Sequence, residues 1–280
     1  MKVKVSRALL LFVLSLFPSL LLGVEAEGTA NYQTIYFYNP ETNINNFASL
    51  KISFDTYLAK FGHYRFQPFN EKELFETSLL EGKQNVYLLS SWHYQLLSGR
   101  LALQPLMVGV YKGRSMQKKI LAVRHDISDV SQLSGKTVAC SGSKQYTENL
   151  LAEMFGTKGE EILKTIKLIL VPKDIDALMA VSFGMATAAL SAERSFENLE
   201  KINQKQFQLL KPLLTSQQHF LTLVALPAGS RADTQLLDVL AKMGINPEGE
   251  TRLRMLGLDG WRKLSEQEKL LLQQQGYKGR

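Results

Sequence analysis

The chain has 280 residues, 45% of them hydrophobic, and a formal net charge of +7. This length is ample for a large core and for more than one lobe. The only cysteine, Cys140, excludes an internal disulfide framework and a multi-cysteine zinc site, and the basic residues form no run long enough for a nucleic-acid groove.

The first 26 residues predict a cleavable secretory signal peptide. Lys2, Lys4 and Arg7 give a positive start, residues 8–22 are almost wholly apolar, and Ala26 ends a small-residue pattern typical of cleavage sites. A transmembrane anchor is the alternative, but the apolar run is shorter than the roughly 20 residues that a bilayer needs. No cysteine near the leader offers a lipid anchor, so we expect a soluble protein of the periplasm. Loss of the leader's three cations and one carboxylate lowers the net charge from +7 to +5, which weakly favours anionic small molecules.

After the leader, short β-like runs alternate with helical ones, as in α/β proteins. In the first series, apolar residues recur at steps of three and four from Ile44 to Phe61, which predicts an amphipathic helix. The series comprises a strand at 34–38, a helix at 42–61, a strand at 63–69, a helix at 71–80, a strand at 85–89, a short helix ending near Gly99, and a strand at 103–111.

A second series follows the polar segment 112–114. It comprises strands at 119–124, 136–140, 166–171 and 186–190, a helical turn at 127–133, and helices at 144–155, 174–183 and 194–202. A third portion holds a strand at 220–226, followed by helices over 233–243 and the charged C-terminal tail.

This order predicts an α/β fold of two lobes, each a mixed sheet flanked by helices. We expect residues 27–111 to form the first part of lobe 1, 112–215 to form lobe 2, and 216–280 to return to lobe 1 and end in C-terminal helices. The strands at 103–111 and 220–226 would cross between the lobes, with hinges at 112–114 and 215–217 and a cleft between the lobes.

The segment between the strand at 136–140 and the helix at 144–155 predicts an anion site. The first backbone N–H groups of a helix have no partner in the helix, and together with its dipole they attract negative charge. Gly142 permits close backbone approach, and Ser141, Ser143 and Thr147 add hydroxyl groups. Capping of the helix by Ser143 is the structural alternative, and the two roles are compatible.

Two enzyme motifs are imitated here and both are incomplete. Residues 135–137 resemble the end of a nucleotide-binding P-loop, but position 130 is valine and the segment precedes a strand. Ser141 and Lys144 have the S-x-x-K spacing of penicillin-binding enzymes, but the partner motifs S-D-N and K-T-G are absent downstream. The four histidines are widely spaced, and we expect neither a metal nor a cofactor.

Other strand ends should face the same cleft, because ligands of open α/β sheets bind beyond the carboxyl ends of strands. Flat side chains with a few fixed polar groups suit a small polar solute, although Trp92 could equally be a packing residue. The candidates at these ends are Tyr38, Asn39, Ser90, Ser91, Trp92 and Ser191.

Three stretches resemble type II periplasmic solute-binding proteins, in the branch of phosphate-, phosphite- and phosphonate-binding components of ABC transporters. They are residues 120–139, with a valine-arginine pair followed by leucine-x-glycine-lysine, residues 176–188, and residues 86–94. The resemblance places the family's anion site on Ser141, Gly142, Ser143 and Lys144, and the adjacent Gln145 is a further candidate for ligand binding. Position 187, often aspartate in that family, is threonine here, so the identity of the anion stays open.

The sequence therefore predicts a monomeric, non-enzymatic protein that captures a small anionic, phosphonate- or phosphate-like solute for a membrane permease. Two alternatives are a ligand-sensing partner of a membrane signalling complex and a secreted hydrolase that uses Ser141 or Ser143.

Overall fold

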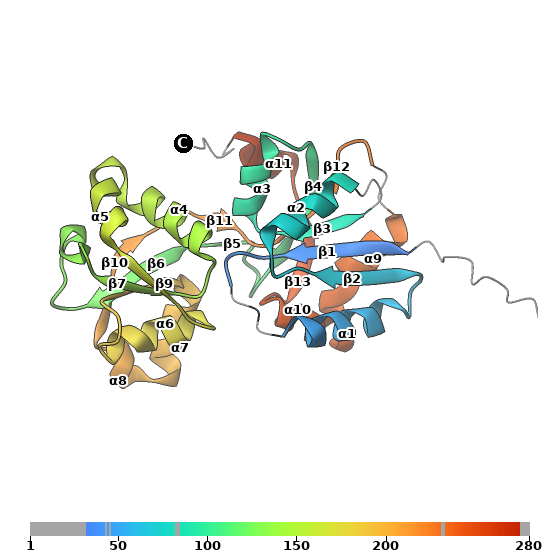
Figure 1. Cartoon of the computed structure of the whole chain (residues 1–280). Coiled ribbons are helices and arrows are strands. Elements are labelled where there is room, and N and C mark those ends of the chain that lie inside the picture. Colours follow the sequence, from blue (N-terminus) through green and yellow to red (C-terminus); the bar gives the residue numbers. More distant parts are fainter. Residues whose placement is uncertain (1–31, 43, 45, 82–84, 231–232, 275–280) are drawn as a thin grey trace, which may run out of the picture. The chain divides into compact units, whose positions relative to one another are not determined.

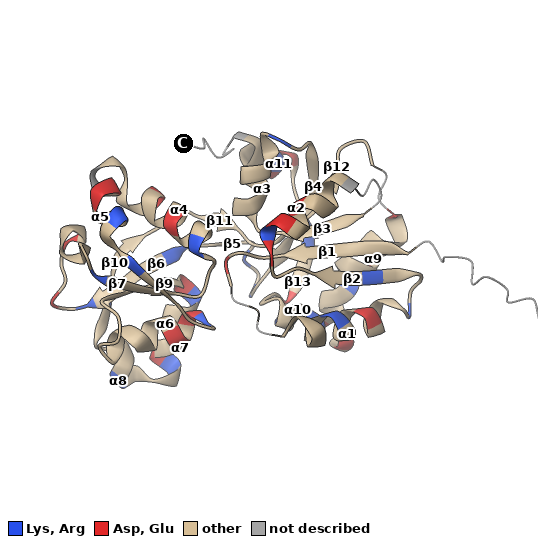
Figure 2. Cartoon of the chain, in the orientation of Figure 1, with Lys and Arg blue, Asp and Glu red and all other residues tan. Residues whose placement is uncertain are grey.

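The computed structural model describes residues 32–274, except for 43, 45, 82–84 and 231–232. The predicted leader lies outside the described residues. Within those ranges, no helix is both long and apolar enough to cross a bilayer. Acidic and basic residues are interspersed along the chain (Figure 2).

One sheet has six strands in the order β13-β4-β12-β3-β1-β2. Strand β1 runs parallel to β2 and β3, whereas β12 runs antiparallel to β3 and β4, and β13 antiparallel to β4. The strands are β1 (Gln33–Tyr38), β2 (Tyr64–Pro68), β3 (Val86–Leu89), β4 (Leu103–Val110), β12 (Leu223–Pro227) and β13 (Gly260–Lys263).

Helices cover both faces of this sheet. Helices α2 (Lys72–Glu81), α3 (Ser91–Ser98) and α11 (Glu266–Gln274) lie on one face, and α1 (Phe47–Leu58) and α10 (Pro247–Met255) on the other (Figure 1). Helix α9 (Thr234–Lys242) contacts β13. The expected helix at 42–61 is shorter in the structure, because Asn46 caps it by accepting the Ser49 N–H.

The second sheet has five strands in the order β10-β6-β9-β7-β8. Its strands are β6 (Lys119–Arg124), β7 (Thr137–Cys140), β8 (Lys167–Leu170), β9 (Ala188–Ala192) and β10 (Leu210–Thr215). Strand β7 is parallel to β8 and β9, and β6 is antiparallel to β9 and β10.

Helices cover both faces of this second sheet (Figure 1). Helices α4 (Lys144–Phe155) and α5 (Glu160–Thr165) lie on one face, and α6 (Asp174–Ser182), α7 (Glu193–Ile202) and α8 (Gln204–Phe207) lie on the other. The apolar core of the six-stranded sheet is separate from the two clusters that pack on the five-stranded one. Short 3-10 turns occupy Val130–Leu133, Thr157–Gly159 and Met243–Ile245.

The chain crosses between the two sheets twice. The first crossing contains β5 (Met116–Gln117) and the second contains β11 (His219–Phe220), and these two short strands pair antiparallel. The strands predicted to cross are found as β4 and β12 within the six-stranded sheet, so the crossings themselves are the short segments beside them. The numerical lobe boundaries given above stay a prediction.

Candidate functional site

The end of β1 and the segment after β7 meet directly. The Ser143 N–H donates to the Pro40 carbonyl oxygen at 2.7 Å. A Cβ on residue 142 would lie 3.1 Å from the same oxygen and 2.7 Å from the Tyr146 ring, so this approach requires glycine. Two strand ends from different sheets, both predicted to carry ligand-binding residues, are thereby brought together.

Two adjoining cavities lie at this junction. The larger, about 190 Å³, is lined by Tyr38, Asn39, Phe47 and Phe69 from one sheet's side and by Ser141–Ser143 from the other. The smaller is about 30 Å³, room for one or two waters. Asn39 and Thr42 line both cavities. The smaller cavity is lined by Asn39, Glu41, Thr42, Gln117, Lys119, Asp174, Arg194, Leu221, Thr222, Leu256, Gly257 and Leu258.

The carboxylate of Asp174, at the start of α6, accepts several hydrogen bonds from residues in and beside the second sheet. It accepts the Ser141 hydroxyl, the Ala192 N–H at 2.7 Å and the Ser195 hydroxyl at 3.4 Å. The Lys119 ammonium lies 3.7 Å away, and the side chains of Lys119 and Asp174 are only 5% and 12% exposed. Burial alone would raise the pKa of Asp174, but Lys119 and the hydrogen bonds outweigh it and hold this pKa below its usual value.

A second carboxylate, that of Glu41, enters the site from the loop after β1. Glu41 is 5% exposed, and its Oε2 accepts the Gln117 side-chain amide at 2.8 Å. Burial raises the pKa of Glu41, and the positive charges of Lys119 and His219 oppose that shift. The partners of Glu41 therefore come from the two crossings and from the second sheet.

Two further basic side chains, those of His219 and Arg194, border the site. Burial alone would lower the pKa of His219, but Glu153, 3.4 Å from its Nε2, reverses this and raises it. Arg194 donates to the Gly257 carbonyl at 2.9 Å and lies 4.7 Å over the Tyr111 ring. Among the charges that line the small cavity, Lys119 and Arg194 balance Glu41 and Asp174, so the site is self-neutralised.

The predicted site residues take different places. Asn39, Ser141 and Ser143 line the cavities. Tyr38 lines the larger one, and its ring packs against Phe75 and His93.

The remaining predicted residues make structural contacts. Trp92 packs edge-on against Tyr146, and the Thr147 side chain is fully buried. Lys144 is exposed and pairs with Glu148, and Gln145 accepts from Lys72. Three serines form internal hydrogen bonds: Ser90 accepts the His93 N–H, Ser91 donates to the Phe220 carbonyl, and Ser191 donates to the Ala192 carbonyl. None of these contacts tests ligand binding, so the ligand roles stay predictions.

The sequence analysis missed the polar and ionisable residues at the centre: Glu41, Gln117, Lys119, Asp174 and His219. Two of them carried a usable signal. Asp174 follows β8 and Glu41 follows β1, and both strands end at a carboxyl edge where ligands bind. The other three lie on or beside the crossings, whose pairing only the folded chain reveals.

Comparison with known proteins agrees with this architecture. A binding-protein component of a phosphonate ABC transporter from Pseudomonas aeruginosa aligns with a TM-score of 0.63 at 13% identity, over 88% of this chain and 85% of that one. A Xanthomonas citri protein with bound chloride gives 0.62 at 15%, over 87% and 95%. PhnD1 of Prochlorococcus marinus, in complex with methylphosphonate, gives 0.57 at 13%, over 87% and 96%.

These likenesses confirm the predicted two-lobed α/β fold. A search of curated proteins found no match. The family model described as "ABC transporter, phosphonate, periplasmic substrate-binding protein" matches residues 55–269, which confirms the resemblance found in the sequence. The chain belongs to the phosphonate family of periplasmic substrate-binding proteins of ABC transporters.

Proposed function

We propose that this protein captures a small organic solute with a single negative charge, of the phosphonate or sulfonate kind, in the cleft around Lys119 and delivers it to a membrane permease. The observation that carries the proposal is the Glu41 carboxylate. It is buried among the side chains of Gln117, Lys119 and His219, where a solute anion would find the same partners.

The two carboxylates play different parts in this proposal. Asp174 is held by Ser141 and Ala192 within its own sheet, and removing it would leave Lys119 uncompensated. Glu41 reaches the site from the other sheet's loop, so it leaves the donors whenever that loop moves away. Without Glu41, the cavity's lining keeps two cations and one carboxylate, which suits one incoming negative charge.

The adjoining cavity gives room for the carbon part of such a solute. Tyr38, Phe47 and Phe69 supply apolar walls next to Ser141 and Ser143. Charge-assisted hydrogen bonds to the head group and burial of a short carbon chain supply the roughly 8 kcal/mol of micromolar binding when the site is preorganised.

The hydrolase alternative is less well supported. Ser141 donates to the Asp174 carboxylate, and Ser143 accepts the Tyr146 N–H as a helix cap, so neither serine is set against a histidine or lysine base in the described structure. A sensing role would use the same capture step and differs only in the partner.

Calorimetric titration of the purified protein with methanesulfonate and methylphosphonate tests the proposal. We expect one-to-one binding, with the solute recovered unchanged by mass spectrometry. If neither compound binds, the proposal is wrong, and a chemically altered solute would instead favour the hydrolase.

A further inference from the structure

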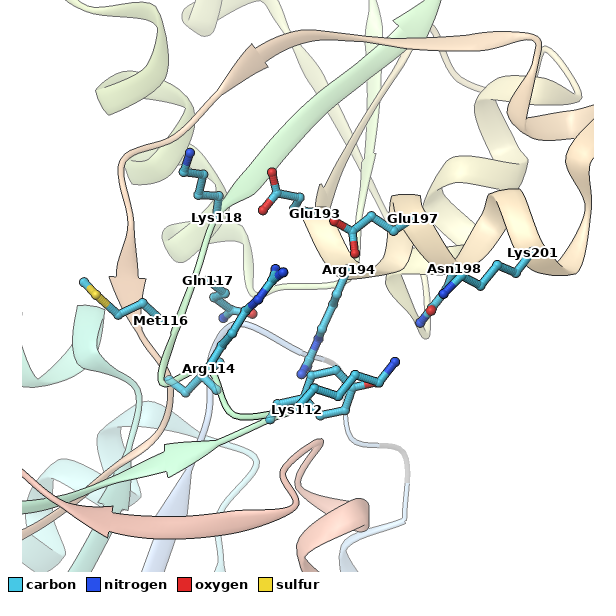
Figure 3. Close-up of a pocket in the computed structure, with 12 residues that line it drawn as sticks. Lys112, Arg114, Met116, Gln117, Lys118, Glu193, Arg194, Glu197, Asn198 and Lys201 are labelled. Carbon is cyan, nitrogen blue, oxygen red and sulfur yellow. The ribbon is translucent and has the colours of Figure 1, made fainter.

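A third cavity, larger than the two of the cleft, lies beside the first crossing and shares Gln117, Arg194 and Leu221 with the smaller of them. It has a volume of about 230 Å³, many times the ~10–15 Å³ that one water needs. One wall is the segment from Tyr111 to Lys118, and the other is α7 (Figure 3). It is lined by Tyr111, Lys112, Arg114, Met116, Gln117, Lys118, Glu193, Arg194, Glu197, Asn198, Lys201 and Leu221.

Positive charge dominates this lining, with five basic residues against the two carboxylates of Glu193 and Glu197, a net charge of +3. Lys112, Arg114, Lys118 and Lys201 make no ion pair with any residue that the structure describes. The function proposed above uses none of these four cations.

The turn that carries two of these cations is built rigidly. Tyr111 and Arg114 exchange both backbone hydrogen bonds, at 2.8 and 3.0 Å. Lys112 and Gly113 both have positive φ, at 49° and 74°, as in the tight turns of hairpins. The Asp259 carboxylate accepts the Lys112 N–H at 2.6 Å and secures the turn. A lysine held in the left-handed region is uncommon, and such strain concentrates at functional sites.

The opposite wall is fixed as well. Arg194 is held by the Gly257 carbonyl and the Tyr111 ring, so its charge stays in place beside the turn. In Figure 3 the Arg114 side chain extends from the turn toward the side of the cavity formed by α7, and Lys112 extends beside Arg194. Basic side chains from the turn and from α7 therefore line the same cavity.

We propose that this cavity is a second binding site, for a small anion with three or more negative charges. A single negative charge would leave most of the unpaired cations without a partner and would meet Glu193 and Glu197. A compact multivalent anion reaches the turn and α7 together and offsets the net charge of the lining. This anion would be a second ligand beside the cleft's solute, and Gln117 and Arg194 border both sites.

Calorimetry at low salt with tripolyphosphate, and with citrate as a second probe, tests this site. We expect one-to-one binding of at least one probe to the purified full chain. The double variant Arg114→Gln, Lys201→Gln should weaken it about tenfold or more, since hydrogen bonds to charged groups are lost. The double variant Glu193→Gln, Glu197→Gln should strengthen it.

The matched control is Lys136→Gln, Lys205→Gln, which removes two exposed lysines elsewhere in the second sheet's unit. It should leave the affinity within about twofold, because distant exposed charges are screened. An equal loss of affinity in the Arg114→Gln, Lys201→Gln variant and in this control would overturn the proposal. So would the failure of both probes to bind. Methanesulfonate titrations of the same variants report on the cleft separately, so failure of this site and failure of the cleft are distinguishable.

Discussion

At the scale of single residues, Asp174 explains how a lysine can lie buried in this site. Burying an isolated ammonium is costly, and the Asp174 carboxylate 3.7 Å away compensates the charge of Lys119. Three further donors hydrogen-bond to that carboxylate and hold it in place. Asp174 and Lys119 are therefore a unit of the second sheet rather than groups that a solute must separate.

This unit makes a prediction about stability. Asp174→Asn removes the charge that balances Lys119 and should lower the free energy of unfolding by about 3 kcal/mol at neutral pH. The pKa of Asp174 is lower in the folded protein than in the unfolded chain, so its contribution is complete above pH ~4 and is lost as the pH falls through the folded value.

Urea unfolding between pH 3 and 7 measures the difference between wild type and variant. It should be largest at pH 7 and shrink toward pH 3. Asp126→Asn, an exposed aspartate 4.0 Å from Arg124, is the control and should have little effect throughout. A variant as stable as the wild type at pH 7 would show that the pair contributes nothing.

At the scale of elements, the contact between the loop after β1 and the start of α4 depends on Gly142. A Cβ added at residue 142 would lie 3.1 Å from the Pro40 carbonyl oxygen. This is a backbone atom, so it cannot move aside as the end of a flexible side chain could. Gly142→Ala should therefore disturb the Ser143–Pro40 hydrogen bond and the Tyr146 ring.

We expect Gly142→Ala to cost about 1–3 kcal/mol of stability and to weaken methanesulfonate binding severalfold. Gly99→Ala is the matched control, because nothing lies within 4 Å of a Cβ there. Thermal unfolding and calorimetry on both variants give the comparison. Unchanged affinity in Gly142→Ala would mean that this junction is not part of the binding site.

The same elements show what local sequence patterns can predict. Helix α4 has the predicted limits, since Ser143 caps it and its apolar periodicity is regular. Strand β10 was missed because it is an edge strand that contains Pro212 and an irregular register. The C-terminal segment, predicted to be helical, contains the helices α10 and α11, but it also contains the short strand β13, whose four residues are too few to give a clear pattern.

At the scale of the whole molecule, the centre of the site depends on contacts that no local pattern encodes. Glu41 and Gln117 are 76 positions apart, and the Ser141–Asp174 pair joins segments 33 positions apart. The sequence predicts which strand ends carry polar groups. Which charges then face one another depends on the order of strands in two sheets and on the paired crossings.

This arrangement also sets the charge of the site. One carboxylate belongs permanently to the second sheet, and the other is contributed from across the cleft. In the function proposed above, a solute anion takes the place of the second carboxylate, so the two compete for the same cations.

The most direct test is calorimetric titration of methanesulfonate into wild type and Glu41→Gln at pH 8. Glutamine keeps the side chain's size and removes its charge, so the variant should bind the monoanion about tenfold more tightly. Glu161→Gln, which changes an exposed glutamate paired with Lys164, should match the wild type. Equal or weaker binding by Glu41→Gln than by wild type would contradict the account.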